Sequence, residues 1–378
     1  GLALSLPVLA LARRYLHGEV MLPRFLSLAV CMVLGFNLVA VAPTLDVALV
    51  GWSLSGFAST FLIGAFNERP TVRNNVVYAF AAYQVSDLAI LTAAVLTAHS
   101  SEAPVAAAAL LLAALFKSGQ FPVSSLLVRS MEGPTPTSAL AYAGLSAHMG
   151  VVLLASTAPL WTEFGWANAV LAAAGAGTAA YSSLVSRIRA DRKGALAHAA
   201  TGTLGAILCV LALGYPGLAQ LLCLGHAGFR MTQVLRAPNQ LADARALRFA
   251  LGTRPWPVPV PDALFKVCWA LLRFHTDFHI IHYLHTLNRH VHRATNWQLS
   301  KWVQYAGTAG VVLLAGFPLS PLTHLREDII AHLIQAHSIL LWPFVGATFT
   351  LSVMLIRFLF LNVLDVRRLR RLHQGKIY

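Results

Sequence analysis

Long apolar runs recur along almost the whole chain, and they restrict the kind of protein it can form. Hydrophobic residues make up 57% of the 378 residues and charged residues only 11%. An ordinary soluble domain is roughly a quarter charged. A water-soluble protein of this length could not hide so much apolar surface, and a disordered chain would be far more polar. The composition therefore predicts an all-α polytopic membrane protein.

About ten segments have the ~20 mostly apolar residues that a helix needs to cross the hydrocarbon core. They predict a bundle of about 10–12 transmembrane helices, near residues 22–42, 46–66, 76–98, 105–127, 137–157, 167–186, 195–214, 216–236, 302–319 and 338–364. The first residues resemble the end of a membrane helix without a signal-peptide pattern or an initiator Met, so we expect the sequence to begin inside a longer protein.

Lysine and arginine are distributed unequally between the two sets of connecting loops. One set contains basic clusters such as Arg13–Arg14, Arg187–Lys193 and the tail Arg367–Lys376. The other set, which includes the predicted loop SPLTHLRED (320–328), is almost free of cations. By the positive-inside rule, the basic loops face the cytoplasm, which predicts a multi-pass membrane protein with this orientation. The basic residues behind the net charge of +14 are therefore expected in cytoplasmic loops. Membrane lipids are the expected partners of these residues, and nucleic acid is not.

The chain divides into three parts by composition. Residues 1–238 form a transmembrane region, residues 239–301 contain a proline-rich cytoplasmic loop and then a histidine-rich interfacial segment, and residues 302–378 hold a final pair of spans and a basic tail. A helix that is apolar on one face and rich in basic residues on the other is typical of the membrane interface.

Lys117 is the strongest functional candidate in the sequence. It follows the apolar run AAAALLLAALF and precedes Pro122, so a lysine falls at membrane depth beside an interrupted helix. Interrupted backbone is tolerated there only where protein or a water-filled cavity satisfies its polar groups. A lysine in such a place can release and regain a proton, which favours a relay over a side chain that snorkels to the interface or makes a structural pair.

Two carboxyl groups accompany this lysine. Asp87 lies within the predicted span 76–98 and needs a partner, for which Lys117 and Arg73 are the candidates. A functional pair and a structural ion pair between two helices are both open. Glu132 lies near the predicted cytoplasmic face at the start of MEGPTP, where capping of a helix is the simpler interpretation.

A later predicted span contains His226 and Arg230, four residues apart and therefore on one helix face. Arginine stays charged in nearly all environments, so Arg230 can set the potential of a water-filled cavity but cannot pass on a proton. His148 and His198 are single histidines on apolar helices. Each is more typical of a hydrogen-bonded core residue than of a relay member.

The densest histidine cluster lies in the interfacial segment. On a helix, its first three members would share one face, within about 60° of one another. No Asp or Glu accompanies them there, so we expect partner docking and no metal site. The cluster comprises His275, His279, His282 and His285, followed by His290 and His292.

Motifs for catalysis or cofactor binding are missing from the sequence. The four cysteines form no CxxC pair and are interpreted as core residues. Phosphate loops, nucleophile elbows and paired catalytic carboxylates are also lacking. The chain is therefore predicted to be a transport or energy-coupling subunit without enzyme activity, and no cofactor is expected in it.

The segment 116–144, FKSGQFPVSSLLVRSMEGPTPTSALAYAG, resembles the signature of the antiporter-like subunits of respiratory complex I (NuoL-like) and of Mrp cation antiporters. A looser resemblance covers residues 11–238. It implies a helical fold of inverted five-helix units, each with a broken helix and a buried lysine on the ion path. It places Lys117 at that lysine, Asp87 at the acidic position of the preceding helix, and His226 and Arg230 at a histidine and a lysine of a later helix.

Three departures separate the chain from complex I and Mrp members. Ser53 stands where those members have a glutamate after the GW motif, and Tyr142 stands where they have a histidine. Those members also have a lysine on the broken helix of their second half, and this chain has no counterpart of that lysine after residue 238. These departures argue against a conventional complex I role.

The chain is more similar to the membrane subunits of DAB-type inorganic carbon transporters, which are called DabB or MpsA-like. Shared features are a small polar residue after GW, the ERP loop at 68–70, the run MEGPTPTSAL and the ending LRAPN. That resemblance implies a large peripheral DabA-like partner that carries zinc, and a flow of H⁺ or Na⁺ that drives CO₂ hydration to bicarbonate. The alternatives are a proton-translocating subunit of a complex I or Mrp assembly and a non-conducting structural anchor.

Overall fold

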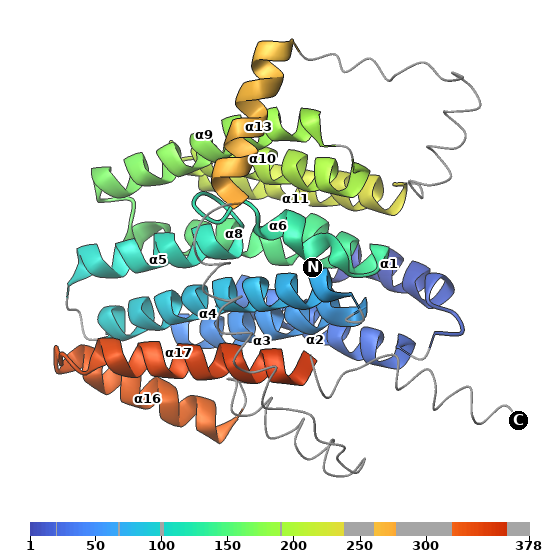
Figure 1. Cartoon of the computed structure of the whole chain (residues 1–378). Helices are drawn as coiled ribbons and strands as arrows, with labels where there is room; N and C mark the ends of the chain where they lie inside the picture. The colour runs from blue at the N-terminus through green and yellow to red at the C-terminus, as the bar shows by residue number, and fades with distance from the viewer. Residues whose placement is uncertain are drawn as a thin grey trace, which may run out of the picture.

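The structure, a computed structural model, describes residues 1–19, 21–66, 69–98, 102–189, 191–237, 261–276 and 320–360. Nearly all of these residues are helical and none of them lies in a β-strand, as the composition predicted. Most helices run side by side in Figure 1, whereas α13 crosses them steeply.

The helices follow the predicted spans closely in the first two thirds of the chain. The longer ones are α1 (Leu2–Tyr15), α2 (Leu22–Val41), α3 (Leu45–Ile63), α4 (Pro70–Ala98), α5 (Ala103–Lys117), α8 (Met149–Ser156), α9 (Gly165–Ile188), α10 (Arg192–Ala212), α11 (Pro216–Leu235), α13 (Asp262–Thr276), α16 (Pro321–Gln335) and α17 (Leu341–Phe358). Between α5 and α8 the helical pieces are short: α6 (Leu126–Arg129), η2 (Ser130–Glu132), α7 (Thr135–Thr137) and the π-helical segment η3 (Ser138–Gly144).

Six described segments are long and apolar enough to cross a membrane: Leu22–Val41, Leu45–Phe66, Thr71–Ala98, Thr135–Ser156, Gly165–Ile188 and Arg192–Ala212. Two shorter apolar helices, Ala103–Lys117 and Leu341–Arg357, accompany them. Helix α11 has 20 residues, but polar side chains such as His226 and Arg230 reduce its hydropathy. The predicted span 302–319 lies outside the described residues.

Glycines allow two helix pairs to approach closely. A Cβ on Gly35 of α2 would lie 2.6 Å from the carbonyl oxygen of Gly51 on α3, and a Cβ on Gly175 of α9 would lie 2.6 Å from that of Gly205 on α10. Small residues at such crossings are the usual means by which membrane helices pack. Helices α3 and α4 lie in the interior, because 83% of the most apolar residues of each are buried. Helix α9 is peripheral, with 28% of such residues buried.

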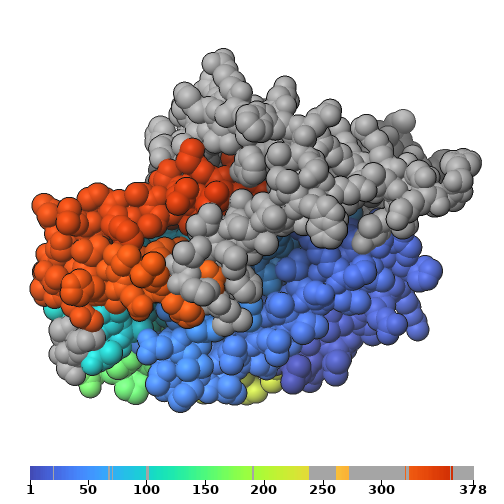
Figure 2. All heavy atoms as spheres, turned by 90° about the horizontal axis from the view of Figure 1, so that it is seen from below, coloured from blue at the N-terminus to red at the C-terminus, as the bar shows by residue number. Residues whose placement is uncertain are grey.

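One prediction for the C-terminal region is wrong. The sequence assigned 320–328 to a loop, but this segment begins α16, which packs against α4 and α17. The segment has too many charges for a lipid-facing span, and its apolar face becomes apparent only when it is followed to Ile330, which is 4% exposed. Figure 2 shows α16 and α17 (orange and red) side by side on the lower face of the molecule.

Candidate functional site

The interrupted helix expected near Pro122 is present. Helix α5 ends at Lys117, and regular helix resumes only at Leu126. Within the interruption, Ser118, Gln120 and Ser124 are fully buried. Non-helical backbone at this depth requires partners from the surrounding protein.

Helices α9 and α10 supply those partners. The backbone N–H of Phe121 donates a hydrogen bond to Thr178 Oγ1 on α9 at 2.8 Å. Gln120 Nε2 donates to the carbonyl oxygen of Thr201 on α10 at 3.5 Å and to that of Ser118 at 3.2 Å. The interruption is thus held in place by side chains and backbone far along the chain.

Replacing Thr178 with valine should destabilise the protein by about 1–3 kcal/mol, because the partly buried N–H of Phe121 would lose its acceptor. Thermal unfolding of the purified protein measures the effect. Thr232→Val is the matched control, since the Thr232 hydroxyl is exposed and bonds only within its own helix. Equal melting temperatures for the two variants would contradict this assignment.

Lys117 is buried, with 1% of its surface exposed. Its Nζ donates a hydrogen bond to the carbonyl oxygen of Trp52 at 2.8 Å. The ammonium lies over two aromatic rings, 5.1 Å from the Trp52 centroid and 4.7 Å from the Tyr83 centroid, which adds cation–π attraction. Gly56 leaves room for it, because a Cβ there would lie 2.8 Å from Nζ. The lysine therefore does not snorkel to the interface.

Asp87 lies on α4, next to α5, and is 8% exposed. Its charge interacts with that of Lys117, and Ser53 of α3 is within hydrogen-bonding reach of its carboxylate. Asp87 and Lys117, which are both described, form no direct ion pair. Their charges attract each other over a longer distance. Arg73, the other candidate partner, lies about 21 Å away along the same helix at 1.5 Å per residue.

Two tyrosines extend the polar interior beyond Lys117. Tyr83, whose ring contacts the ammonium, donates a hydrogen bond from its hydroxyl to Tyr142 Oη at 3.3 Å. Tyr142 belongs to the π-helical segment Ser138–Gly144 and is 2% exposed. Tyr142, which stands where a histidine was expected, is thus hydrogen-bonded to Tyr83, a neighbour of Lys117.

The structure brings three of the predicted residues together around α11. His148 Nε2 and His226 Nδ1 lie 2.8 Å apart, and Arg230 Nε donates to His226 Nε2 at 3.3 Å. His226 Nε2 also lies 3.1 Å from Thr203 Oγ1, so the tautomer of His226 decides which of its ring nitrogens donates in these contacts. Arg230 also donates to Thr203 Oγ1 at 2.9 Å and to the Ala199 carbonyl at 3.0 Å, both on α10. His148 is thus buried and hydrogen-bonded, as expected of a core histidine, and its partner is His226.

A cavity of about 870 Å³ opens at the end of the bundle where the basic loops gather. Five cations and two carboxylates line it: Arg69, Arg129, Arg189, Arg192, Lys193, Glu132 and Asp191. These residues come from segments that are far apart in the sequence, and they include Arg189, Arg192 and Lys193 of the predicted basic cluster Arg187–Lys193.

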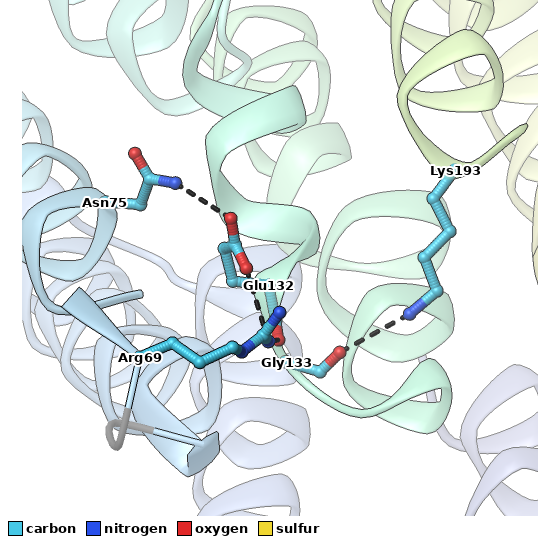
Figure 3. A network of polar contacts seen from close by, with 5 residues as sticks. All are labelled: Arg69, Asn75, Glu132, Gly133 and Lys193. Atoms are coloured by element: carbon cyan, nitrogen blue, oxygen red, sulfur yellow. Dashed lines mark hydrogen bonds and ion pairs between the residues drawn. The ribbon is translucent and has the colours of Figure 1, made fainter. Parts of the chain in front are cut away.

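Glu132 lies in the wall of this cavity, and the helix-capping interpretation is wrong. Figure 3 shows its carboxylate between α4 and the start of α10. It accepts a hydrogen bond from Asn75 Nδ2 at 3.1 Å and pairs with Arg69 at 3.3 Å, while Lys193 Nζ donates to the neighbouring Gly133 carbonyl at 3.5 Å. The turn after it begins at Pro134 without a side-chain cap. Glu132 thus binds the start of α4 at this cavity, and the neighbouring Gly133 carbonyl binds the start of α10.

His198 lines the same cavity, 6.0 Å from the Tyr181 ring between centroids, and it is separate from the pair around α11. The structure does not describe the side chains of the predicted docking histidines. His275 falls in the last turn of α13 with an undescribed side chain, and His279, His282 and His285 lie outside the described residues. Within the described part of the chain, no group of three metal-ligating side chains occurs.

Several residues of the site were missed in the sequence. Tyr83 precedes Asp87 by four residues on one helix face, and this spacing could have identified it. Trp52 acts through its carbonyl, which no sequence pattern signals. Arg326 and Glu327, which line a cavity beside Asp87, were hidden in a segment assigned to a loop.

Comparison with known proteins agrees with this geometry. Residues 42–249 match the family described as "NADH:quinone oxidoreductase/Mrp antiporter, TM". The chain is 29% identical over 266 residues to the "Probable inorganic carbon transporter subunit DabB1" of Halothiobacillus neapolitanus, covering 64% of this chain and 47% of the relative. DabB2 of the same organism is 30% identical over 262 residues, with the same coverage.

A complex I relative is similar to the same degree. NADH-ubiquinone oxidoreductase chain 5 of Locusta migratoria is 27% identical over 273 residues, covering 67% of this chain and 47% of that protein. A chain of the Mrp complex from Dietzia sp. DQ12-45-1b superimposes with a TM-score of 0.50 and 20% identity, over 89% of this chain and 35% of the other. The chain thus spans about half the length of its curated relatives.

The family match covers more than half of the chain, and it includes the interrupted helix with its buried lysine. The resemblance that the sequence suggested is confirmed, since DabB, complex I and Mrp proteins are all similar to the chain. We conclude that the chain belongs to the membrane-spanning NADH:quinone oxidoreductase/Mrp antiporter family.

Proposed function

We propose that this chain is the cation-conducting membrane subunit of a DAB-type complex in a bacterial inner membrane. The single observation that carries the proposal is the ammonium of Lys117, held at the end of an interrupted helix with 1% of its surface exposed. A buried amine can exist with or without its proton. H⁺ is therefore the favoured cargo, with Na⁺ as the alternative.

The surroundings of Lys117 support an ion path through the membrane. Asp87 supplies a negative charge nearby. Tyr83 and Tyr142 lead away from the ammonium through linked hydroxyls, and hydroxyls can accept and donate protons in turn. The pair His148–His226 provides two further exchangeable groups, beside which Arg230 holds a permanent charge. The basic cavity with Glu132 would be the cytoplasmic end of this path.

Two features favour a DAB-type complex over complex I or Mrp. Two of the relatives, DabB1 and DabB2, are named as probable inorganic carbon transporter subunits. Ser53 leaves the lysine without the glutamate that the complex I resemblance implies. In this proposal, cation flow through the chain drives CO₂ hydration in a DabA-like partner. The zinc and the carbonic-anhydrase-like chemistry would belong to that partner.

The identity of the partner tests the proposal directly. An affinity-tagged full chain should be purified from native membranes in mild detergent, and its partners identified together with their bound metals. We expect a large hydrophilic subunit with stoichiometric zinc. Recovery of flavin- and iron–sulfur-containing subunits would instead support the alternative, a complex I-type role, which the similarity to NADH-ubiquinone oxidoreductase chain 5 makes specific.

A structural anchor without transport is the remaining alternative from the sequence. It predicts that charge-neutral variants at Lys117 and Asp87 keep the full activity of the complex. The burial of Lys117 argues against it, because a decayed channel would have no reason to retain a buried charge that costs several kcal/mol to desolvate.

A further inference from the structure

A second set of charged residues approaches Asp87 from helix α16. Arg326 and Glu327 of α16 line a cavity of about 280 Å³ together with Gln84 and Asp87 of α4. Apolar residues of α16 and α17, among them Ile330 and Val345, form the rest of the wall. Figure 2 shows the two C-terminal helices next to each other at this face.

The contacts tie α16 to α4 at one level of the bundle. Arg326 NH1 donates a hydrogen bond to Gln84 Oε1 at 3.3 Å. Gln84 is three residues before Asp87, so both side chains point from the same side of α4. Asp87 Oδ1 is buried and accepts no hydrogen bond from any described residue. One oxygen of the carboxylate is thus free to bind something in the cavity.

The size of the cavity and the polar side chains at one wall would allow water to bind. At about 30 Å³ per water molecule, its volume would hold several. Gln84, Asp87, Arg326 and Glu327 line it together with mostly apolar residues. A water needs 2–4 polar partners to stay in such a place. Protons can move along short chains of this kind between two carboxylates.

The charges beside the cavity alternate in sign: Lys117, Asp87, Arg326 and Glu327. Each buried charge needs an opposite charge close by, because taking an ion out of water costs several kcal/mol. Arg326 supplies a permanent positive charge beside Asp87, whereas Glu327 can take up and release a proton. The Glu327 side chain is 17% exposed and lies 3.7 Å from His324, which is 54% exposed.

The cavity lies toward the end of the bundle opposite the basic cavity. From Asp87, α4 continues for about 16 Å to Ala98, at 1.5 Å per residue, and α16 continues from Glu327 for about 12 Å to Gln335. Ala98 belongs to the loop side that is poor in cations, whereas Arg69 and Lys193 mark the other end. Glu327 therefore lies between Lys117 and the outer face.

We propose that Glu327, beside Asp87 and Arg326 in this cavity, is the outward proton site of the path through Lys117. The C-terminal helices would then supply the acidic group that Ser53 does not. This inference rests on the proposed function, since it requires that protons reach Lys117. It concerns residues outside the part of the chain that matches the family, 42–249.

Proton flux in vesicles tests the inference. The full chain, with any partner that co-purifies, is reconstituted into liposomes, and flux is followed with a trapped pH dye after a potassium diffusion potential is applied. We expect Glu327→Gln to lower the flux at least tenfold and Glu327→Asp to restore most of it, since aspartate keeps the carboxyl group. Asp328→Asn is the matched control, because it removes the same charge from the exposed neighbour on α16.

The outcomes separate the two proposals. If Lys117→Met stops the flux while Glu327→Gln leaves it unchanged, the inference is overturned and the proposed function stands. If flux persists in Lys117→Met itself, the proposed function fails. An equal loss in Glu327→Gln and Asp328→Asn would show a general charge effect and also overturn the inference. Should Glu327→Gln not fold, a tenfold lower flux in Arg326→Gln with normal flux in Asp328→Asn would support it, and normal flux in Arg326→Gln would overturn it.

Discussion

Replacing Lys117 with methionine is expected to reduce cation flux at least about 100-fold, the effect typical of removing a residue that transfers a proton. Methionine has a similar length and no charge, so the fold should tolerate it in this aromatic surrounding. The flux assay in liposomes measures the effect directly. In cells without other uptake routes for inorganic carbon, the same variant should prevent growth in air.

Two further variants separate proton transfer from mere charge. Lys117→Arg keeps a positive charge but cannot release a proton, so it should conduct as poorly as Lys117→Met. Gly56→Ala should also lower the flux, since the added Cβ would come within 2.8 Å of Nζ and displace the ammonium without touching rigid backbone. Wild-type flux in Lys117→Arg would refute the relay and leave only an electrostatic role.

Replacing Gly205 with valine is expected to have the largest effect on stability. A Cβ on Gly205 would lie 2.5 Å from the carbonyl oxygen of Gly175 and 3.0 Å from Gln120 Oε1. The two helices would have to separate, and overpacking of this kind costs about 1–3 kcal/mol or more. Since Gln120 belongs to the interruption after Lys117, the variant should lose both folded yield and flux. Size-exclusion profiles and melting temperatures in detergent measure the first effect.

Gly177→Val is the matched control for this variant. Gly177 lies on α9, two residues after Gly175, but a Cβ there would meet nothing within 4 Å. The control should therefore fold and conduct like the wild type. If both valines were equally harmful, helix propensity would explain the loss, and the close crossing of α9 and α10 would be irrelevant.

The sequence predicted the features that depend on local composition. The apolar runs located α2 to α11, because a membrane helix must be about as long as the bilayer is thick. Lys117 and Pro122 located the interrupted helix, since a charge and a proline at that depth are both costly unless protein surrounds them. These properties are visible in a few neighbouring residues.

Features that depend on contacts between distant segments could not be predicted. The bond between His148 and His226 joins residues that are far apart in the chain, so His148 had the appearance of a lone histidine and His226 was grouped only with Arg230. Glu132 was assigned to a cap because Arg69 and Asn75 are invisible as its partners from the sequence. Helix α16 was missed because it has charged residues on two sides: Arg326 and Glu327 face α4, whereas Asp328 is exposed. This removes the usual contrast between an apolar and a polar face.

The dependence of the interruption on α9 and α10 has a consequence for biosynthesis. A ribosome delivers Lys117 to the membrane well before Thr178 and Thr201, which bind the interrupted segment. Until those helices have been inserted, the nascent chain carries a lysine and unsatisfied backbone at bilayer depth, a state that lipid alone cannot stabilise. The translocon must therefore shelter Lys117 and the segment after it until α9 and α10 have been inserted, and the conducting arrangement can form only then.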